Sequence, residues 1–271
     1  LLLGLGLPFG FVFFRNLLND KVQERKDVEQ ITATPILGEL SHNDTKETLL
    51  VKQGSRMPIV EMFRLIRTKL HFAAVDKENK IILVTSGISG EGKTFFSINL
   101  AASLVLTGKK VVLLELDLRN PNLLKGLNLP KGLGITDYLV STDVYLTDLV
   151  MPHEEVPGLY VVGAGPVPPD PAELMMSPKL AHLISELKES FDHIVIDSAP
   201  VGQVADAFSL SPLIDSTIYL IRYDYTLKKQ IELIEDIYRN KLLRHPLIVL
   251  NDAKKQQGVR YEYSYGHYQK K

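Results

Sequence analysis

The chain has 271 residues, of which 45% are hydrophobic and 23% charged, and its formal net charge is −1. This composition is that of a globular protein with a sizeable core, and the charge gives no reason to expect a nucleic-acid partner. The absence of cysteine excludes disulfides, thiolate metal sites and a thiol nucleophile. The seven histidines show no metal-ligand spacing, so we interpret them as surface or packing residues.

The first segment is an uncharged apolar stretch, residues 1–14, followed by Arg15. Such a stretch rises about 21 Å as a helix, which is too short to cross a bilayer. It lacks the basic start and cleavage site of a signal peptide. Because further basic residues follow it, we interpret 1–15 as the end of a truncated transmembrane helix with the cytoplasm downstream. A buried core helix or a loose apolar terminus is the alternative.

Residues 16–55 are polar and mixed, and we expect a juxtamembrane linker with one docking element at Pro35–Gly38. A domain over 56–255 should follow, opening with a helix from Pro58 to about Ala74. Short β-branched runs predict strands, and amphipathic stretches between them predict helices. The strands are expected at 81–85, 111–116, 159–162, 194–196, 217–221 and 247–250, and the helices at 94–107, 178–190 and 227–242.

Apolar strands that alternate with helices indicate an α/β fold with a mostly parallel central sheet and helices on both faces. The stretch 121–158, rich in Gly, Pro and Asp, is the hardest to assign. Residues 256–271 contain almost no aliphatic side chain, so we expect a flexible tail.

The strongest motif is GISGEGKT, which runs from Gly87 to Thr94 between a predicted strand and a predicted helix. This context identifies a P-loop of a P-loop NTPase-type fold, in which backbone N–H groups and the helix N-terminus bind phosphate. Lys93 should reach the β- and γ-phosphates of ATP, and the Thr94 hydroxyl should ligate Mg²⁺. The expected nucleotide-binding residues are Gly87, Ser89, Gly90, Glu91, Gly92, Lys93, Thr94 and Phe95.

Two further strands end in acidic residues. The first carries Glu115 and Asp117, which period-two spacing puts on one side of the strand, and the second ends at Asp197, as a Walker B motif does. Both ends should meet at the carboxyl edge of the sheet, where open α/β sheets bind ligands. An acid there can bind Mg²⁺ or deprotonate an attacking hydroxyl.

Together these motifs resemble those of the bacterial tyrosine kinase (BY-kinase) family, over nearly the whole chain. The family's Walker A′ pattern, DxDxR, is here Glu115, Asp117 and Arg119, so its first aspartate is replaced by glutamate. The resemblance implies a catalytic set of Lys93, Glu115, Asp117, Arg119 and Asp197, with metal ligands Thr94, Asp117 and Asp197. Asp117 is the candidate base for the tyrosyl hydroxyl. By the same resemblance Asn251 contacts adenine, although a turn or capping role is an equal alternative.

Two more segments match the family. Glu61, Arg64 and Arg67 fit its ExxRxxR motif, which is associated with ring-shaped oligomers; the alternative is a solvated helix face with an i,i+3 pair. On that helix the apolar side is expected to hold Met62, Leu65, Ile66, Leu70 and Ala73. Four tyrosines close the chain and are the implied phosphoacceptors, modified in trans by a neighbouring subunit: Tyr261, Tyr263, Tyr265 and Tyr268.

The resemblance therefore implies an ATP- and Mg²⁺-dependent tyrosine autokinase at the cytoplasmic side of a bacterial inner membrane. Its expected partners are other copies of the chain, the exopolysaccharide or capsule polymerisation and export machinery, and a protein-tyrosine phosphatase. A partition-type ATPase switch is one alternative, but Ile88 stands where those ATPases carry a signature lysine. The other alternative is a nucleotide-binding scaffold in which Glu115 impairs turnover.

Overall fold

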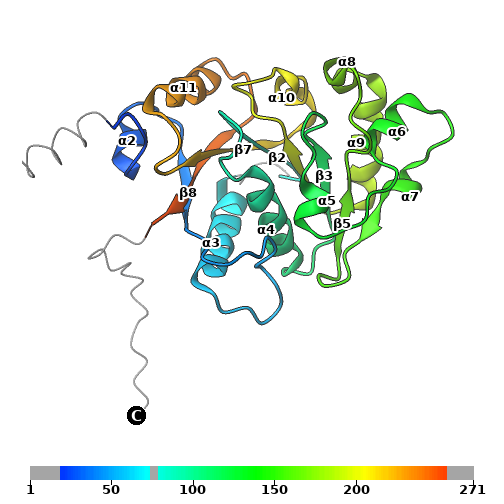
Figure 1. Ribbon diagram of the computed structural model, residues 1–271, viewed down its shortest axis with the longest axis horizontal. Helices are drawn as coiled ribbons and strands as arrows, with labels where there is room; N and C mark the ends of the chain where they lie inside the picture. Colours follow the sequence, from blue (N-terminus) through cyan, green and yellow to red (C-terminus); the bar gives the residue numbers. More distant parts are fainter. Residues whose placement is uncertain (1–18, 74–78, 255–271) are drawn as a thin grey trace, which may run out of the picture.

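The computed structural model describes residues 19–73 and 79–254, and its centre is an eight-stranded sheet with the order β1-β8-β7-β2-β6-β3-β5-β4 (Figure 1). All neighbouring strands pair in parallel except β4, which is antiparallel to β5. The strands are β1 (Ile36–Ser41), β2 (Ile81–Ser86), β3 (Val111–Leu116), β4 (Met151–Pro152), β5 (Leu159–Val162), β6 (His193–Ser198), β7 (Ser216–Arg222) and β8 (Pro246–Ala253). The expected parallel α/β fold is confirmed.

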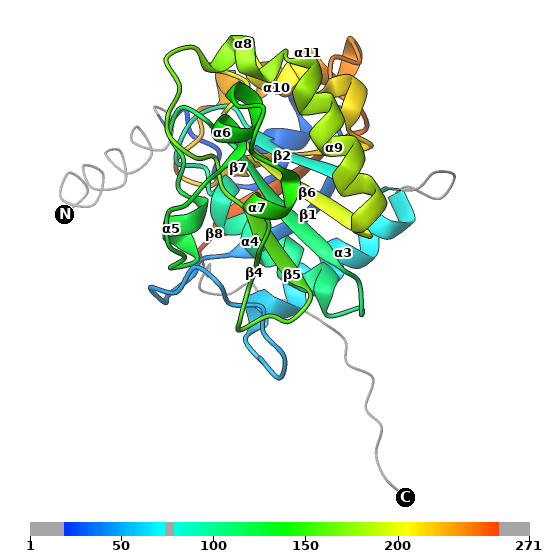
Figure 2. The same cartoon turned by 90° about the vertical axis from the view of Figure 1, so that its right-hand side faces the viewer.

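Helices cover both faces of the sheet (Figures 1 and 2). On one face lie α3 (Pro58–Ala73) and α4 (Lys93–Val105), and on the other α9 (Pro178–Ser190) and α11 (Ile231–Arg239). The remaining helices are α2 (Arg25–Glu29), α5 (Leu123–Gly126), α6 (Ile135–Val140), α7 (Leu146–Leu149), α8 (Pro171–Met175), α10 (Asp206–Ser209), η1 (Ser211–Leu213) and η2 (Lys228–Gln230). The stretch that was hardest to assign contributes the short elements α5 to α7 and β4.

The buried strands explain why the sheet needs two covered faces. In β2 every residue is buried, and successive side chains enter two different hydrophobic clusters. Ile81 and Leu83 join the cluster under α9 and α11, whereas Ile82 and Val84 join the cluster under α3 and α4. A continuous apolar run is therefore satisfied on both sides, as in other parallel sheets.

The segment expected to be a linker is part of the folded unit in its described residues. Its apolar island lies in β1, which pairs with β8 through Ile36 and Ile248 and forms one edge of the sheet. Leu40 and Val51 are completely buried. The main-chain N–H groups of Leu50 and Val51 donate to the Asn99 side chain of α4. These contacts attach residues 19–55 to the sheet and α4, so no packing boundary lies near residue 56.

The apolar face expected for the first long helix was partly wrong. Phe63 is completely buried in α3 and packs against Phe95 and Phe96, with ring centroids 6.0 and 5.6 Å away. Leu65, which was expected on the buried side, is 39% exposed, and Ala73 is exposed as well. The stripe follows the i, i+3, i+4 spacing from Ile59 through Phe63 rather than a stripe through Leu65.

The predicted membrane segment and tyrosine tail lie outside the described residues, which include neither 1–18 nor 255–271. Within 19–73 and 79–254, no helix combines the length and apolar character needed to cross a bilayer.

Candidate nucleotide-binding site

The P-loop connects β2 to α4, at the centre of the sheet. Gly90 and Gly92 have φ angles of +88° and +98°, in the left-handed region that disfavours residues with a Cβ. Lys93, the first residue of α4, is buried and 7% exposed. Because α4 begins inside the loop, its free N–H groups and positive dipole end face the phosphate position.

Asp197 occupies the end of β6 directly beside the loop. Its Oδ2 accepts a hydrogen bond from the Thr94 hydroxyl at 2.7 Å, and its Oδ1 accepts one from the Ser97 hydroxyl at 3.1 Å. Burial raises the pKa of Asp197 to about 7, against the opposing effects of the Thr94 bond and the Lys93 charge. Ser97 was not singled out in the sequence, although it lies one helical turn after Lys93 and so on the same side of α4.

Lys93 lies among several carboxylate groups. Burial lowers the pKa of Lys93, and the neighbouring carboxylates of Asp197, Asp117 and Glu91 oppose that shift. The site therefore brings together four of the predicted residues: Lys93, Thr94, Asp117 and Asp197. An ammonium group in this position attracts the phosphates of a nucleotide.

The two Walker A′ acids have different surroundings. Glu115 is 2% exposed, and its carboxylate accepts backbone N–H groups of Leu123 at 2.5 Å and Ala164 at 3.2 Å. Asp117 is only partly buried, and its Oδ1 accepts the Asn120 N–H at 3.1 Å. Glu115 thus joins the loop after β3 to the end of β5. Both of its oxygens are engaged by the main chain, and Asp117 is the more exposed of the two acids.

The guanidinium of Arg119 is engaged by another side chain and is not free to face the phosphate position. Its Nε and Nη2 donate to the two oxygens of Asp206 at 2.9 and 3.2 Å. The Asp206 side chain is 7% exposed, whereas that of Arg119 is 40% exposed. This bidentate pair fixes the Walker A′ loop to α10. No local pattern indicates Asp206 as a partner of Arg119, because the two residues are 87 positions apart.

Phe95 and Asn251 take places different from those expected of nucleotide contacts. The Phe95 ring packs edge-on against Phe63 between α3 and α4, so the described role of its side chain is structural. Asn251 is 8% exposed, and its amide donates to the Glu91 carbonyl at 2.9 Å. The amide of Asn251 is therefore directed at the P-loop itself.

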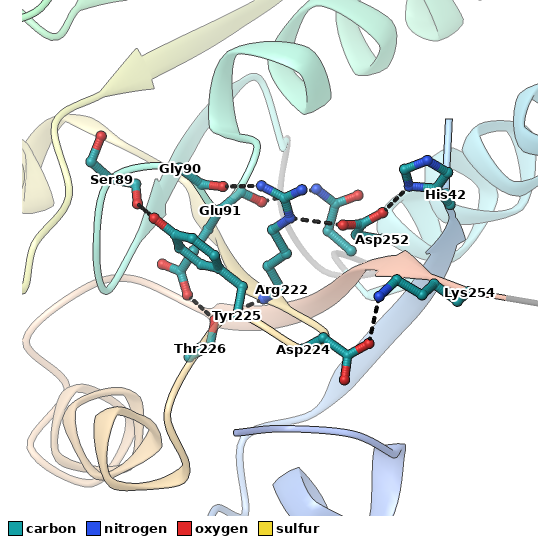
Figure 3. A network of polar contacts seen from close by, with 11 residues as sticks. His42, Ser89, Gly90, Glu91, Arg222, Asp224, Tyr225, Thr226, Asp252 and Lys254 are labelled. Carbon is teal, nitrogen blue, oxygen red and sulfur yellow. Dashed lines mark hydrogen bonds and ion pairs between the residues drawn. The ribbon is translucent and has the colours of Figure 1, made fainter. Parts of the chain in front are cut away.

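A buried carboxylate braces the inside of the loop. Glu91 is completely buried, accepts the Ile88 N–H at 2.8 Å and is hydrogen-bonded to the Thr226 hydroxyl (Figure 3). Burial raises the pKa of Glu91, and these hydrogen bonds oppose the shift. The side chain of Glu91 thus joins the loop to the segment after β7, and the expected contact of Glu91 with nucleotide is left to its backbone N–H group.

On α3, Glu61 and Arg64 form the i,i+3 ion pair of the structural alternative. The Arg67 guanidinium donates to the Ser103 carbonyl of α4 at 2.6 Å, and burial lowers the pKa of Arg67. Arg67 is thus used within the chain, whereas Glu61 and Arg64 are accessible to a second copy. The candidate phosphoacceptors at 261–268 lie outside the described residues.

The oxygen donors beside the P-loop fit Mg²⁺. One hydroxyl and two carboxylates, from Thr94, Asp117 and Asp197, converge around Lys93, and Mg²⁺ prefers oxygen ligands completed by phosphate and water. Among residues 19–73 and 79–254, no group of three or more His, Cys, Asp or Glu side chains is arranged to hold a metal without such help.

Comparison with known proteins identifies this arrangement. Residues 82–265 match the family model described as the CobQ/CobB/MinD/ParA nucleotide binding domain. The tyrosine-protein kinase YwqD of Bacillus subtilis (strain 168) is 35% identical over 170 residues, covering 63% of this chain and 71% of the relative. The tyrosine-protein kinase ptk of Acinetobacter johnsonii is 29% identical over 253 residues, and the match covers 89% of this chain but only 34% of that kinase.

Among solved structures, the chimerical protein CapA2B2 superposes with a TM-score of 0.78 and 30% identity, covering 86% of this chain and all (100%) of that chain. The P-loop, the Walker B aspartate and the parallel sheet thus occur here within a sequence related to kinases over most of its length. The chain belongs to the CobQ/CobB/MinD/ParA nucleotide-binding family and, within it, to the bacterial tyrosine kinases.

Proposed function

We propose that the chain is an ATP-dependent protein-tyrosine autokinase. The observation that supports this most directly is the convergence of Lys93, Thr94 and Asp197 beside Asp117, whose carboxylate is only partly buried. The chain spans about a third of the length of the ptk relative.

In the proposed reaction, the tyrosyl oxygen attacks the γ-phosphorus of ATP, the bond to the β,γ-bridging oxygen breaks, and ADP leaves. Lys93 and the N-terminus of α4 hold the phosphates in line with the acceptor and balance their charge. Asp117 accepts the phenolic proton. The Thr94 hydroxyl, Asp117 and Asp197 would hold Mg²⁺, which would supply charge neutralisation at the phosphates.

The proposed acceptors are Tyr261, Tyr263, Tyr265 and Tyr268, presented in trans by another copy of the chain. Glu61 and Arg64 are candidates for the contact between copies, because both are accessible on α3. The family relationship favours action at the inner membrane with exopolysaccharide or capsule polymerisation and export machinery, opposed by a tyrosine phosphatase. Successive phosphates, each adding about −1.5 to −2 charges, would reverse the basic character of the tail and weaken association.

The decisive experiment is incubation of the purified chain with Mg-ATP, followed by mass spectrometric mapping of phosphate. Phosphotyrosine within 261–268 in the wild type, and none in Lys93→Met, is the expected result. Absence of tyrosine phosphorylation from a wild-type sample that binds ATP and self-associates would refute the proposal.

A partition-type ATPase is the second candidate, because the matching family model also covers the MinD and ParA proteins. It predicts ATP hydrolysis that is unchanged when residues 256–271 are deleted, with no phosphotyrosine formed. The scaffold alternative attributes an impaired metal site to Glu115. The buried main-chain contacts of Glu115 and the accessibility of Asp117 argue against this alternative.

A further inference from the structure

The outer side of the P-loop is covered by side chains from two distant segments. The Tyr225 hydroxyl donates to the Ser89 carbonyl at 2.9 Å, and Arg222 Nη1 donates to the Gly90 carbonyl at 2.8 Å (Figure 3). Asn251 Nδ2 donates to the Glu91 carbonyl at 2.9 Å. Three consecutive carbonyls of the loop thus each accept a hydrogen bond from a side chain more than 130 positions away.

Holding a carbonyl group in place also sets the direction of the N–H group on the other side of the same peptide. In a planar trans peptide, the C=O of one residue and the N–H of the next point in opposite directions. When the carbonyls of Ser89, Gly90 and Glu91 are held toward β7 and β8, the following N–H groups of Gly90, Glu91 and Gly92 are turned the other way. Phosphate binding by a P-loop requires such N–H groups to be directed at the oxygens.

The donors themselves are held in place. Asn251 lies within the buried part of β8, between β7 and β1. Arg222 Nε donates to Asp252 Oδ2 at 2.8 Å, and Asp252 is in turn hydrogen-bonded to His42. The Arg222 guanidinium also lies 5.2 Å from the centroid of the Tyr225 ring. A planar guanidinium that donates to two acceptors and contacts an aromatic ring has little conformational freedom.

The loop glycines leave room for these donors. A Cβ on Gly90 would lie 2.5 Å from the Tyr225 hydroxyl oxygen, and a Cβ on Gly92 would lie 2.2 Å from Asn251 Nδ2. Both distances are too short for non-bonded atoms. The two glycines therefore serve the outer contacts as well as the positive φ angles of the loop.

We propose that Arg222, Tyr225 and Asn251 are positioning residues that set the peptide orientations of the P-loop before nucleotide arrives. They act through the carbonyls of Ser89, Gly90 and Glu91 and touch no reacting atom. The idea rests on the nucleotide-binding part of the proposed function and is independent of what accepts the phosphoryl group. It also gives Asn251 a role distinct from reading the adenine base.

The test is the affinity of three variants for MgADP and for magnesium tripolyphosphate, which carries phosphates but no base or ribose, measured by calorimetry or by displacement of a fluorescent nucleotide. Tyr225→Phe removes only the hydroxyl, and Arg222→Lys keeps the charge but not the fork. Each should weaken both ligands by about fivefold, the effect of one lost hydrogen bond. Asn251→Asp replaces a donor with an acceptor facing a carbonyl and should cost about tenfold or more.

Tyr145→Phe is the matched control, because Tyr145 is 66% exposed and directly precedes α7; its affinities should equal those of the wild type. In Tyr225→Phe the KM for ATP should rise while kcat stays within about twofold, since uniform binding is lost. The midpoint of thermal unfolding without nucleotide should be unchanged, which separates positioning of the loop from general stability.

Wild-type affinity of Tyr225→Phe and Arg222→Lys for both ligands would overturn the proposal, whether or not Asn251→Asp folds. A loss in Asn251→Asp confined to MgADP, with tripolyphosphate binding unchanged, would show base recognition instead and overturn it for that residue. A wild type that binds MgADP but forms no phosphotyrosine refutes the proposed kinase function and leaves the loop inference standing.

Discussion

Asp197 and Asp117 end two neighbouring strands of the sheet, and their surroundings differ. Asp197 on β6 is 2% exposed and receives two hydroxyl hydrogen bonds from α4. Asp117 follows β3, is less buried, and has the backbone N–H of Asn120 as a partner. The first carboxylate is held by two side-chain hydrogen bonds in a buried position, and the second is more exposed to an incoming group. Two carboxylates at adjacent strand ends thus have different surroundings because they are buried to different extents.

The largest expected effect of testing this difference between the two aspartates comes from neutralising Asp117. Asp117→Asn keeps the side-chain volume but cannot accept the phenolic proton, so tyrosine phosphorylation should fall by about 10²–10⁴-fold. MgADP affinity should change far less, because Lys93 and the loop remain. Radioactive or mass spectrometric assay of phosphotyrosine, alongside calorimetry with MgADP, tests the split; a variant with near-normal phosphorylation would remove Asp117 from the role of base.

The second test uses the burial of Asp197. Since its pKa is raised from 3.8 to about 7, the folded protein without nucleotide binds a proton there that the unfolded chain has released. This group's contribution to stability is complete below about pH 4 and declines as the pH rises toward 7. Asp197→Asn should therefore raise the unfolding midpoint at pH 8 by roughly 3–6 °C and leave it nearly unchanged at pH 4.

Thermal unfolding of both proteins in buffers without nucleotide or divalent cation checks that sign. An unchanged or lower midpoint for Asp197→Asn at pH 8 would contradict it. Asp117→Asn, measured in parallel, should gain less because Asp117 is less buried.

Glu115 provides a third test, within one Walker A′ motif. Glu115→Asp shortens the side chain that links the Leu123 and Ala164 N–H groups, so unfolding should become easier by about 1–3 kcal/mol. Phosphorylation per folded molecule should not increase. Chemical denaturation gives the first quantity; a large gain in activity would instead show that the natural glutamate impairs the site.

The smallest expected effect concerns the ion pair between Arg119 and Asp206. Arg119→Gln and Asp206→Asn should each destabilise the protein, while the double variant should cost less than their sum by about 1 kcal/mol. A double-mutant cycle by denaturation measures that coupling. Additive effects would mean that the bidentate pair is not an energetic unit.

The central strands and the P-loop followed from sequence because their signals are local. Runs such as 111–116 are apolar, short and β-branched, and the glycine spacing before Lys93 has one dominant structural meaning. β1 was missed as a strand since Gly38 and Glu39 interrupt its apolar pattern, and its place depends on pairing with β8. The wrong phase of α3 came from counting Leu65, where Phe63 decides the packing.

Other parts of the site could not be read from local patterns. Asp206 meets Arg119, and Tyr225 meets Ser89, only because the fold brings separate strand ends to one edge. The division of roles between Glu115 and Asp117 was also open. Period-two spacing puts both side chains on one side of the strand, but it does not indicate the main-chain N–H groups that Glu115 contacts there.

The pairing of β1 with β8 has a practical consequence for truncated forms of the protein. A fragment starting at residue 56 would convert β8 from an internal strand into an unprotected edge, with unpaired main-chain groups available to other molecules. It would also remove His42, which is hydrogen-bonded to Asp252. Such a fragment should be prone to aggregation and to weakened nucleotide retention even though every Walker motif is intact.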